Sequence, residues 1–483
     1  MVDGKFTGKL SVTNHYDFTS LKQCRFQWKL VRFPAPSEVK TPARTLAEGR
    51  APSPAVPPHG SGELAVPLPA NWRDADALSL VAIDPDQQEL WNWVWPLPGI
   101  THPANANTND GAPKLETAAG ELRLMAEGIT ASFDATSGLL KKVQCGEKTF
   151  ALSNGPRLAF AKSKSAGSVE WLSLATADAA AHTYRLASPH LASTAEMEID
   201  FNKSDLDARY KLEISPDGQK WKTLFEGNQL TNKLKSCNFA PQIVAALRIS
   251  KDGQPLGLKS VRLGYAAGDY PIESTAPATI TSGNGKDPKT GKPVAWLESR
   301  GGTGLNFRWS LSGDGSLRLD YDYTLNGEYR YHGITFDHPE DQMQSLSWLG
   351  EGPYRVWQNR LRGTWLGIHE TAYNDIQPGA SWGYPEFQGF FSGLRWANLE
   401  TPAGRLTVAT ASPDVYLRVG TPRISHENTT VAFPAGDISF LKAIPGIGSK
   451  FGACEHSGPA GQPAKANGDC HGTLTFTFAG AKP

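Results

Sequence analysis

The sequence predicts an all-β protein built from several sandwich-like domains. Apolar and polar residues alternate in many segments, whereas helical periodicity is scarce. Glycine and proline are frequent, with 48 and 35 copies among 483 residues, and the aromatic residues include 14 tryptophans. Frequent turn residues imply many short strands, and large aromatic side chains are well suited to fill the space between two packed sheets.

The clearest alternation lies in "SLRLDYDYTL". Leu317, Leu319 and Tyr321 fall on one face of this segment, and Arg318 and Asp320 fall on the other. A segment near the C-terminal end, "TLTFTF", alternates in the same way. This period of two residues predicts antiparallel strands that bury one face and expose the other.

A β-hairpin is predicted in "GITASFDATSGLLKKVQ". One strand runs to Phe133, a turn follows from Asp134 to Gly138, and the next strand returns along the first. Glycine fits the end of this turn because it adopts positive φ angles without steric cost.

The charge balance is neutral, with 48 basic and 48 acidic residues. Nucleic-acid-binding and membrane-surface proteins show a clustered basic excess, so neither class is predicted. No apolar stretch reaches the roughly 18 residues of a membrane span. The opening "MVDGKFTGKLSVTNHYDF" lacks the apolar segment of a signal peptide. We therefore expect the chain to begin within a longer protein.

Composition divides the chain into three predicted parts. Residues 1–102 resemble an immunoglobulin-like sandwich. Residues 103–165 and 273–483 are expected to form one domain, which residues 166–272 interrupt as an inserted sandwich. Linkers are expected in "ITHPANANTNDGAPK" and "TSGNGKDPKTGKP", where asparagine, proline, glycine and lysine gather.

The inserted part resembles a discoidin-like (F5/8 type C) carbohydrate-binding sandwich. The resemblance rests on "YKLEISPDGQKWKTLFEG", in which a strand ends at Ser215 and a tight turn runs to Gly218. Trp221 is expected to pack into the core of this domain, and so is Trp171. The resemblance implies that the insert holds polysaccharide.

Two motifs resemble the C-terminal β-galactosidase small-chain domain of glycoside hydrolase family 2, a galactose-mutarotase-like β-supersandwich. In addition, "SFDATSGLL" resembles the opening hairpin of that domain. "KLSVTNHYDF" resembles the start of the immunoglobulin-like sandwich that follows the catalytic barrel in these enzymes. The motif "LSWLGEGPYRVWQNR" supplies Trp348, Gly350, Gly352, Pro353 and Arg360, and departs from the family pattern at Arg355, Trp357 and Asn359. The motif "YPEFQGFFSGLRWANLE" supplies Tyr384, Pro385, Glu386, Gly389, Arg395 and Trp396.

The resemblance implies structural roles for the first motif. Gly350 and Gly352 are expected to let the backbone turn sharply, and Pro353 is expected to fix that turn. Trp348 and Trp357 would then cover the edge of a sheet.

Charged residues of both motifs are expected to stabilise the same region. Arg360 and Glu386 are candidates for a buried, hydrogen-bonded ion pair, with Arg395 as another partner. Such a pair mainly sets geometry, so these residues are expected to hold the fold rather than to contact a sugar.

The resemblance places catalysis outside this chain. Retaining glycosidases need two carboxylates about 5 Å apart, and family 2 carries both on a (β/α)8 barrel, whose strand–helix alternation is absent from this sequence. The chain then resembles a C-terminal part or small subunit that supports the active-site rim, assembly and glycan binding. The implied partners are a carbohydrate and a barrel-bearing subunit or N-terminal part, within an oligomer. No cofactor is expected.

The terminal domain of the family lends one aromatic residue to the galactose site, shortly before a Gly-x-Gly turn. The matching turn in this sequence is "IPGIGSKF". Counting back from it reaches Asp437 rather than a tryptophan, and Phe440 is the nearest aromatic residue. Phe440, Trp396 and Arg395 are therefore the candidates for substrate binding.

Two other functions stay open. Supersandwich folds also serve as sugar mutarotases, which use a histidine and a glutamate. A free-standing enzyme of that kind, or a glycosidase, would use Glu386 and His338 as catalytic candidates, with Asp337 and Glu340 beside them. His338 also fits a polar loop residue. The remaining alternative is a carbohydrate-binding protein that depends on the insert alone.

Cys454 and Cys470 flank the loop "CEHSGPAGQPAKANGDC". A disulfide between them would stabilise the fold by about 3 kcal/mol and would indicate a periplasmic or secreted protein, whereas free thiols are the alternative. His456 and His471 lie beside this pair, but their spacing fits no standard zinc pattern, so no metal site is predicted. The other cysteines are expected to be small buried apolar residues: Cys24, Cys145 and Cys237.

Overall fold

The structure is all-β, as predicted, and its regular elements are β-strands with a few short 3-10 helices among the described residues. No helix in this part of the chain is long and apolar enough to span a membrane. The structure is a computed structural model that describes residues 6–97, 111–163, 169–199, 208–227, 236–266, 278–288, 290–301, 304–372, 389–420, 431, 433–449 and 451–480.

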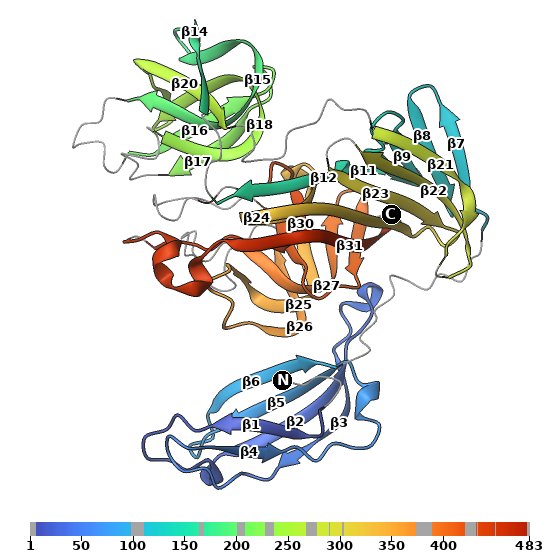
Figure 1. Cartoon of the computed structure of the whole chain (residues 1–483), viewed down its shortest axis with the longest axis vertical. Coiled ribbons are helices and arrows are strands. Elements are labelled where there is room, and N and C mark those ends of the chain that lie inside the picture. The colour runs from blue at the N-terminus through green and yellow to red at the C-terminus, as the bar shows by residue number, and fades with distance from the viewer. Residues whose placement is uncertain are drawn as a thin grey trace.

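The N-terminal strands form two sheets that share one core (Figure 1). One sheet pairs β1 (Lys9–Thr13) with β4 (Ser61–Ala65). The other has the order β3-β2-β5-β6. Alternate residues of both sheets point into this core, which makes a small sandwich. The strands of the second sheet are β2 (Arg25–Arg32), β3 (Arg44–Ala51), β5 (Ala77–Ile83) and β6 (Glu89–Pro96). The 3-10 helices of this part are η1 (Leu21–Gln23), η2 (Pro36–Glu38) and η3 (Trp72–Asp74).

The central body is built around its longest strand, β24 (Leu317–Asp337), which has 21 residues. Antiparallel pairings from β24 through β30, β29, β27, β28 and β31 return to β24 and close a ring. The strands of the ring besides β24 are β27 (Phe390–Thr401), β28 (Gly404–Thr410), β29 (Tyr416–Val419), β30 (Ile438–Ala443) and β31 (Ala464–Gly480).

Further strands extend this ring on both sides. One series runs from β24 through β12 and β10 to β7, a second runs from β24 through β23 and β22 to β21, and β25 and β26 follow β27. The first series contains β7 (Lys114–Ala118), β8 (Glu121–Ala126), β9 (Ile129–Asp134), β10 (Leu140–Cys145), β11 (Lys148–Phe150) and β12 (Ser153–Lys162). The others are β21 (Ala278–Lys286), β22 (Pro293–Gly301), β23 (Leu305–Ser312), β25 (Ser345–Val356) and β26 (Trp365–Ala372), with the 3-10 helices η5 (Glu340–Gln342), η8 (Cys454–Ser457) and η9 (Pro459–Gly461).

A separate sheet, drawn in green in Figure 1, has the order β13-β20-β15-β18-β16-β17 and surrounds a core of its own. We call it the inserted sheet. Its strands are β13 (Val169–Ser173), β14 (Ala175–Asp178), β15 (Thr183–Glu198), β16 (Tyr210–Ser215), β17 (Lys222–Gly227), β18 (Ser236–Lys251), β19 (Gln254–Pro255) and β20 (Ser260–Ala266). The predicted domain boundaries after residues 102, 165 and 272 all lie outside the described residues, so the division stays a prediction.

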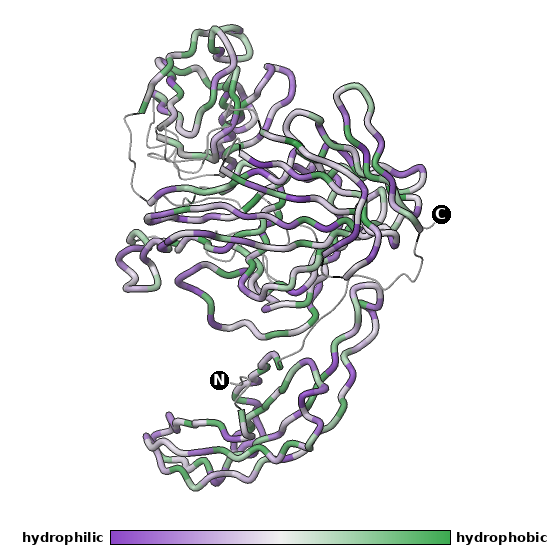
Figure 2. The backbone as a smooth tube through the Cα atoms, turned by 45° about the vertical axis from the view of Figure 1, so that its right-hand side comes forward, coloured by the Kyte–Doolittle hydropathy of each residue, from purple (hydrophilic) through white to green (hydrophobic). Residues whose placement is uncertain are grey.

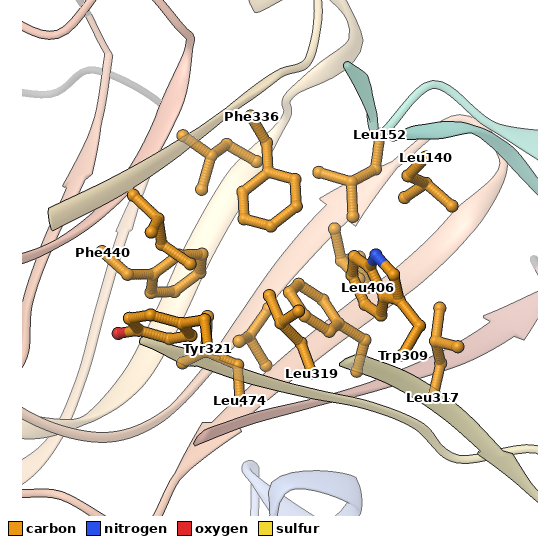
Figure 3. Close-up of a cluster of buried hydrophobic side chains, with 14 of the residues drawn as sticks. Leu140, Leu152, Trp309, Leu317, Leu319, Tyr321, Phe336, Leu406, Phe440 and Leu474 are labelled. Carbon is orange, nitrogen blue, oxygen red and sulfur yellow. The ribbon is translucent and has the colours of Figure 1, made fainter. Parts of the chain in front are cut away.

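The main core fills the central body with large apolar side chains (Figure 3). Trp309 has no exposed surface, and its ring centroid lies 5.7 Å from that of Phe133, 6.2 Å from that of Phe336 and 5.6 Å from that of Phe476. Because β24 alternates through this core, Leu317, Leu319 and Tyr321 are buried, as their spacing predicted. Figure 2 shows the short-range alternation of hydrophobic and hydrophilic residues along such strands.

The predicted hairpin is confirmed. Strands β9 and β10 pair antiparallel across it, and Asp134 Oδ1 accepts hydrogen bonds from the backbone N–H groups of Thr136 and Ser137. Gly138 adopts a φ of +74°. The linker predicted in "TSGNGKDPKTGKP" is wrong, because its first half belongs to β21, which pairs with β22 through a turn at Asp287.

The sharp turn predicted at Gly350 and Gly352 is also wrong. Both residues lie inside β25, and the chain turns only afterwards, where Arg360 N–H donates to the carbonyl of Trp357 at 2.8 Å. A neighbouring strand requires glycine at residue 350, because an added Cβ would stand 2.9 Å from the carbonyl oxygen of Ser392. Pro353 follows in the same strand.

The two tryptophans of this motif are core residues rather than a cover for a sheet edge. Trp348 has no exposed surface, and only 1% of Trp357 is exposed. The Trp348 ring lies 4.5 Å from that of Phe391, and its Nε1 donates to the carbonyl of Glu351 at 3.3 Å. Arg360 is exposed, so the prediction of a buried position for this residue is wrong.

The predicted disulfide is contradicted, because both Cys454 and Cys470 are free. Cys454 belongs to η8 and contacts Gly461, whereas Cys470 lies within β31, opposite Tyr323. Strands rise about 3.3 Å per residue, so Cys470 lies about 20 Å along β31 from Ala464, the first residue of that strand. The periplasmic or secreted location loses this support and stays a prediction. Among the other cysteines, Cys24 is buried as predicted, whereas Cys145 and Cys237 are only partly buried.

Candidate functional site

A cavity of about 970 Å³ lies between the central body and the inserted sheet. Its floor comes from β12 and β24, and its opposite wall comes from β16, β17 and the turn between them. Figure 1 shows the inserted sheet next to β12 and β24. The volume is at the upper end of the range for small-molecule sites, which combine apolar walls with a few polar groups.

The floor carries a neutralised ion pair. Arg157 in β12 contacts Asp337, the last residue of β24, through Nη2 and Oδ1. The other carboxylate oxygen, Oδ2, accepts a hydrogen bond from Nδ2 of Asn154 at 2.8 Å. All three residues line the cavity. Both oxygens of Asp337 are therefore engaged, and its charge is balanced within the wall.

The opposite wall presents a tryptophan. Trp221 precedes β17, is partly exposed and lines the cavity. The guanidinium of Arg248 lies 4.2 Å from the centroid of its ring, and Nε of Arg248 donates to Glu213 at 2.8 Å. This stack holds the indole in place. The predicted core position of Trp221 is therefore wrong, and Trp171 is also only partly buried.

Lys222 extends from β17 into the same cavity. Its side chain keeps accessible surface, but protein atoms crowd around it, and this desolvation lowers the pKa of its ammonium group. The carboxylates of Asp437, Glu340 and Asp337 oppose that shift. The cation and these acids thus belong to one electrostatic cluster.

Asp437 lies behind the cavity wall, two residues after the lining residue Ala435. Burial raises the pKa of the Asp437 carboxyl, whereas a 2.8 Å hydrogen bond from the backbone N–H of His338 to Oδ2 and the charge of Lys222 oppose the rise. Carboxyl groups with such shifts in a cleft are candidates for a functional site.

The catalytic candidates have different positions. His338 has no exposed surface and does not line the cavity, and its Nδ1 lies 3.2 Å from the carbonyl oxygen of Pro339. Glu386 lies outside the described residues. A catalytic role for either residue stays a prediction, and the burial of His338 does not favour it.

The substrate-binding candidates are not gathered at the cavity. Phe440 is fully buried in β30, with its ring 6.2 Å from those of Phe336 and Phe476. Trp396 is fully buried in β27, where the N-terminal sandwich packs on the central body. Their role in binding sugar stays a prediction that this burial does not favour.

Arg395 is half-buried in β27. Burial raises the pKa of the Glu351 carboxyl, and the Arg395 guanidinium opposes that rise. Arg395 was expected as another partner in the pair of Arg360 with Glu386, and that pairing stays a prediction because Glu386 lies outside the described residues. Among the described acids, Glu351 is the one whose charge acts on Arg395.

The residues that make the cavity were missed because they come from distant parts of the sequence. Arg157 and Asn154 follow the first hairpin, Lys222 belongs to the insert, and Asp337 ends a strand more than a hundred residues later. Only Asp337 was nominated from the sequence. The described residues contain no group of histidine, cysteine, aspartate and glutamate side chains that could hold a metal ion.

Comparison with known proteins identifies one region. Residues 10–93 match the family model described as beta-galactosidase, domain 4. No curated protein matches the chain. Among solved structures, the galactose 1-epimerase from Lactobacillus acidophilus NCFM is similar with a TM-score of 0.26 and 10% identity, over 75% of this chain and 95% of the epimerase. A likeness this distant carries no argument. The domain 4 match confirms the predicted likeness to β-galactosidase for the N-terminal sandwich.

Proposed function

We propose that this chain is a carbohydrate-binding, non-catalytic component of a β-galactosidase-like glycoside hydrolase. The match of residues 10–93 to β-galactosidase domain 4 carries the proposal. The two motifs that resemble the small-chain domain of family 2 extend it to the central body. The catalytic barrel would be supplied by a partner subunit or by another part of the same enzyme, within an oligomer.

The cavity between the central body and the inserted sheet is the proposed glycan site. Trp221 offers a ring surface for the apolar face of a sugar, and Asn154 and Arg157 offer groups that hydrogen-bond to hydroxyls. The discoidin-like character of the insert belongs to this proposal, because such a domain would contribute one wall of the site.

Binding is tested with one tryptophan variant and a matched control. Trp221→Ala should weaken binding of a galacto-oligosaccharide about threefold to tenfold, as measured by calorimetry, because it removes an aromatic contact. Trp171→Ala is the control, because Trp171 is also partly exposed and lies under an arginine, Arg262 at 4.3 Å, but does not line the cavity. Equal losses in both variants would count against a glycan site in the cavity.

The non-catalytic role is tested by assaying the purified chain on an aryl β-galactoside. We expect no turnover above background, because the paired carboxylates that retaining glycosidases need are expected on the barrel. Co-purification of a barrel-bearing chain from the native source would support the proposal further.

One observation favours a second candidate, a free-standing sugar-converting enzyme. Three nominated residues are connected to the cavity: Asp337 lines it, His338 donates its backbone N–H to Asp437, and the charge of Glu340 acts on Lys222. Turnover of an aryl glycoside, or anomeric interconversion, by the chain alone would favour this candidate if Glu386→Gln or Asp437→Asn abolished it. The variant would have to keep the near-UV circular dichroism of the wild type.

A further inference from the structure

Two lysines of the cavity wall form no direct ion pair with a described residue. Lys220 and Lys222 both line the cavity, and neither forms an ion pair or a side-chain hydrogen bond with any described residue. The other charged residues of the lining, Arg157 and Asp337, neutralise each other. The lining therefore carries an excess of positive charge from Lys220 and Lys222, and its one acidic residue, Asp337, is already paired with Arg157.

The two lysines are the sequence neighbours of the aromatic residue of this wall. Trp221 separates them in the sequence, and all three residues line the cavity. The stack on Arg248 fixes the indole. A ligand that lies against this ring is therefore within the range of the flexible four-carbon stems of both lysines.

We infer that the cavity takes an acidic sugar unit, whose ring packs against Trp221 while its carboxylate or sulfate group contacts the ammonium groups of Lys220 and Lys222. The inference rests on the proposed carbohydrate-binding function and names the class of glycan. It distinguishes a uronic acid or a sulfated sugar from the neutral galactosides that the β-galactosidase likeness alone would suggest.

The electrostatics of the surrounding groups favour an anion at this place. Asp437 and Glu340 act on Lys222, but neither residue lines the cavity. Asp337 is already engaged by Arg157 and Asn154. An anionic ligand would offset the desolvation that lowers the pKa of Lys222, and charge-assisted hydrogen bonds are the stronger kind.

The test compares three ligands by calorimetry on the full chain. These are trigalacturonic acid, a sulfated galacto-oligosaccharide and neutral galactotriose, at neutral pH and moderate salt. We expect one or both acidic ligands to bind about tenfold more tightly than the neutral one, which is the effect of one charge-assisted hydrogen bond. The two acidic ligands show whether the anion is a carboxylate or a sulfate ester.

The double variant Lys220→Gln with Lys222→Gln should remove this preference, so that the acidic ligands bind no more tightly than galactotriose. Lys148→Gln is the matched control, because Lys148 is exposed in β11 and does not line the cavity. Thermal unfolding and near-UV circular dichroism show whether each variant is folded. Because both lysines keep accessible surface, we expect the double variant to fold normally.

These measurements distinguish a failure of this inference from a failure of the proposed glycan site. Equal binding of acidic and neutral ligands would overturn this inference and leave the proposed glycan site intact. A preference that persists in the double variant would overturn it too, because the anion would then bind elsewhere. Absence of binding by every ligand would overturn both the inference and the proposed site.

Discussion

Gly352 lies directly against the imidazole ring of His369. A Cβ atom at residue 352 would stand 2.6 Å from Cδ2 of that ring. The ring has little room to move, because only 9% of His369 is exposed and the ring centroid lies 5.3 Å from that of Trp348 and 5.7 Å from that of Trp365. The adjacent strand β26, rather than a turn, therefore requires glycine at this position.

Substituting Gly352 by alanine should therefore destabilise the central body. We expect Gly352→Ala to lower the free energy of unfolding by about 1–3 kcal/mol, which is typical of overpacking in a dense core. Urea unfolding followed by tryptophan fluorescence measures this change. The control is Gly285→Ala, because a Cβ there would meet its nearest atom, Nε1 of Trp296, at an ordinary 3.6 Å. Its effect should stay within about 0.5 kcal/mol, and equal effects in both variants would contradict this explanation.

The stability of the central body should fall in mild acid because of His332. Burial lowers the pKa of His332 from 6.5 to about 4, and the charge of Lys442 contributes. The imidazole Nδ1 lies 3.0 Å from the hydroxyl of Tyr323, within hydrogen-bonding distance. Between these two pKa values the unfolded chain binds a proton that the folded chain does not. The stability that the neutral His332 ring contributes is therefore fully present above the pKa of the unfolded chain, 6.5. This contribution decreases as the pH falls towards 4, by up to about 3 kcal/mol.

The variant His332→Gln isolates this contribution. Glutamine does not titrate and can still hydrogen-bond to Tyr323, so the fall in stability between pH 6.5 and pH 4 should become shallower. Denaturant unfolding at a series of pH values gives the slope. His15→Gln is the control, because His15 is exposed. An unchanged slope in the His332 variant would show that this ring is not buried in its neutral form.

The sequence was sufficient to predict elements whose structure depends only on neighbouring residues. The alternation through Leu317 and Leu319 predicted β24, because the pleat sends successive side chains to opposite faces. The turn at Asp134 was also readable, since its hydrogen bonds run to residues two and three positions later. Such features depend on neighbours in the sequence alone.

The site could not be predicted, because its residues depend on contacts between distant segments. A tryptophan after a tight turn looks the same whether it enters a core or lines a cavity, and the floor facing Trp221 comes from β12 and β24. Likewise, nothing in residues 348–353 shows that His369 and Ser392 approach the backbone. Glycine was therefore attributed to a turn, which is its commoner use.

The five cysteines should all react as free thiols. Titration of the purified chain in denaturant without a reductant should give five thiols for each chain. The melting temperature should also be the same with and without a reductant, because no cross-link limits the unfolded state. A titre of three thiols would reveal a disulfide and would revive the pairing of Cys454 with Cys470.

Asn398 joins the N-terminal sandwich to the central body. Its Nδ2 donates to the carbonyl oxygen of Pro36 at 2.8 Å, and its Oδ1 accepts from the hydroxyl of Thr407 at 2.7 Å. The side chain is fully buried. Asn398→Ala should lower the free energy of unfolding by about 1–3 kcal/mol, because it leaves buried polar groups on both partners without this bond.

The same variant should loosen the N-terminal sandwich from the central body. Limited proteolysis should release the N-terminal fragment faster from Asn398→Ala than from the wild type, since the bond to Pro36 crosses this interface beside its apolar cluster. Asn306→Ala is the matched control, because its side chain bonds only exposed groups within the central body, the Asp322 carboxylate and the backbone N–H of Gly301. If both variants were cleaved at the rate of the wild type, the apolar contacts around Phe33 and Trp396 would hold the interface without Asn398.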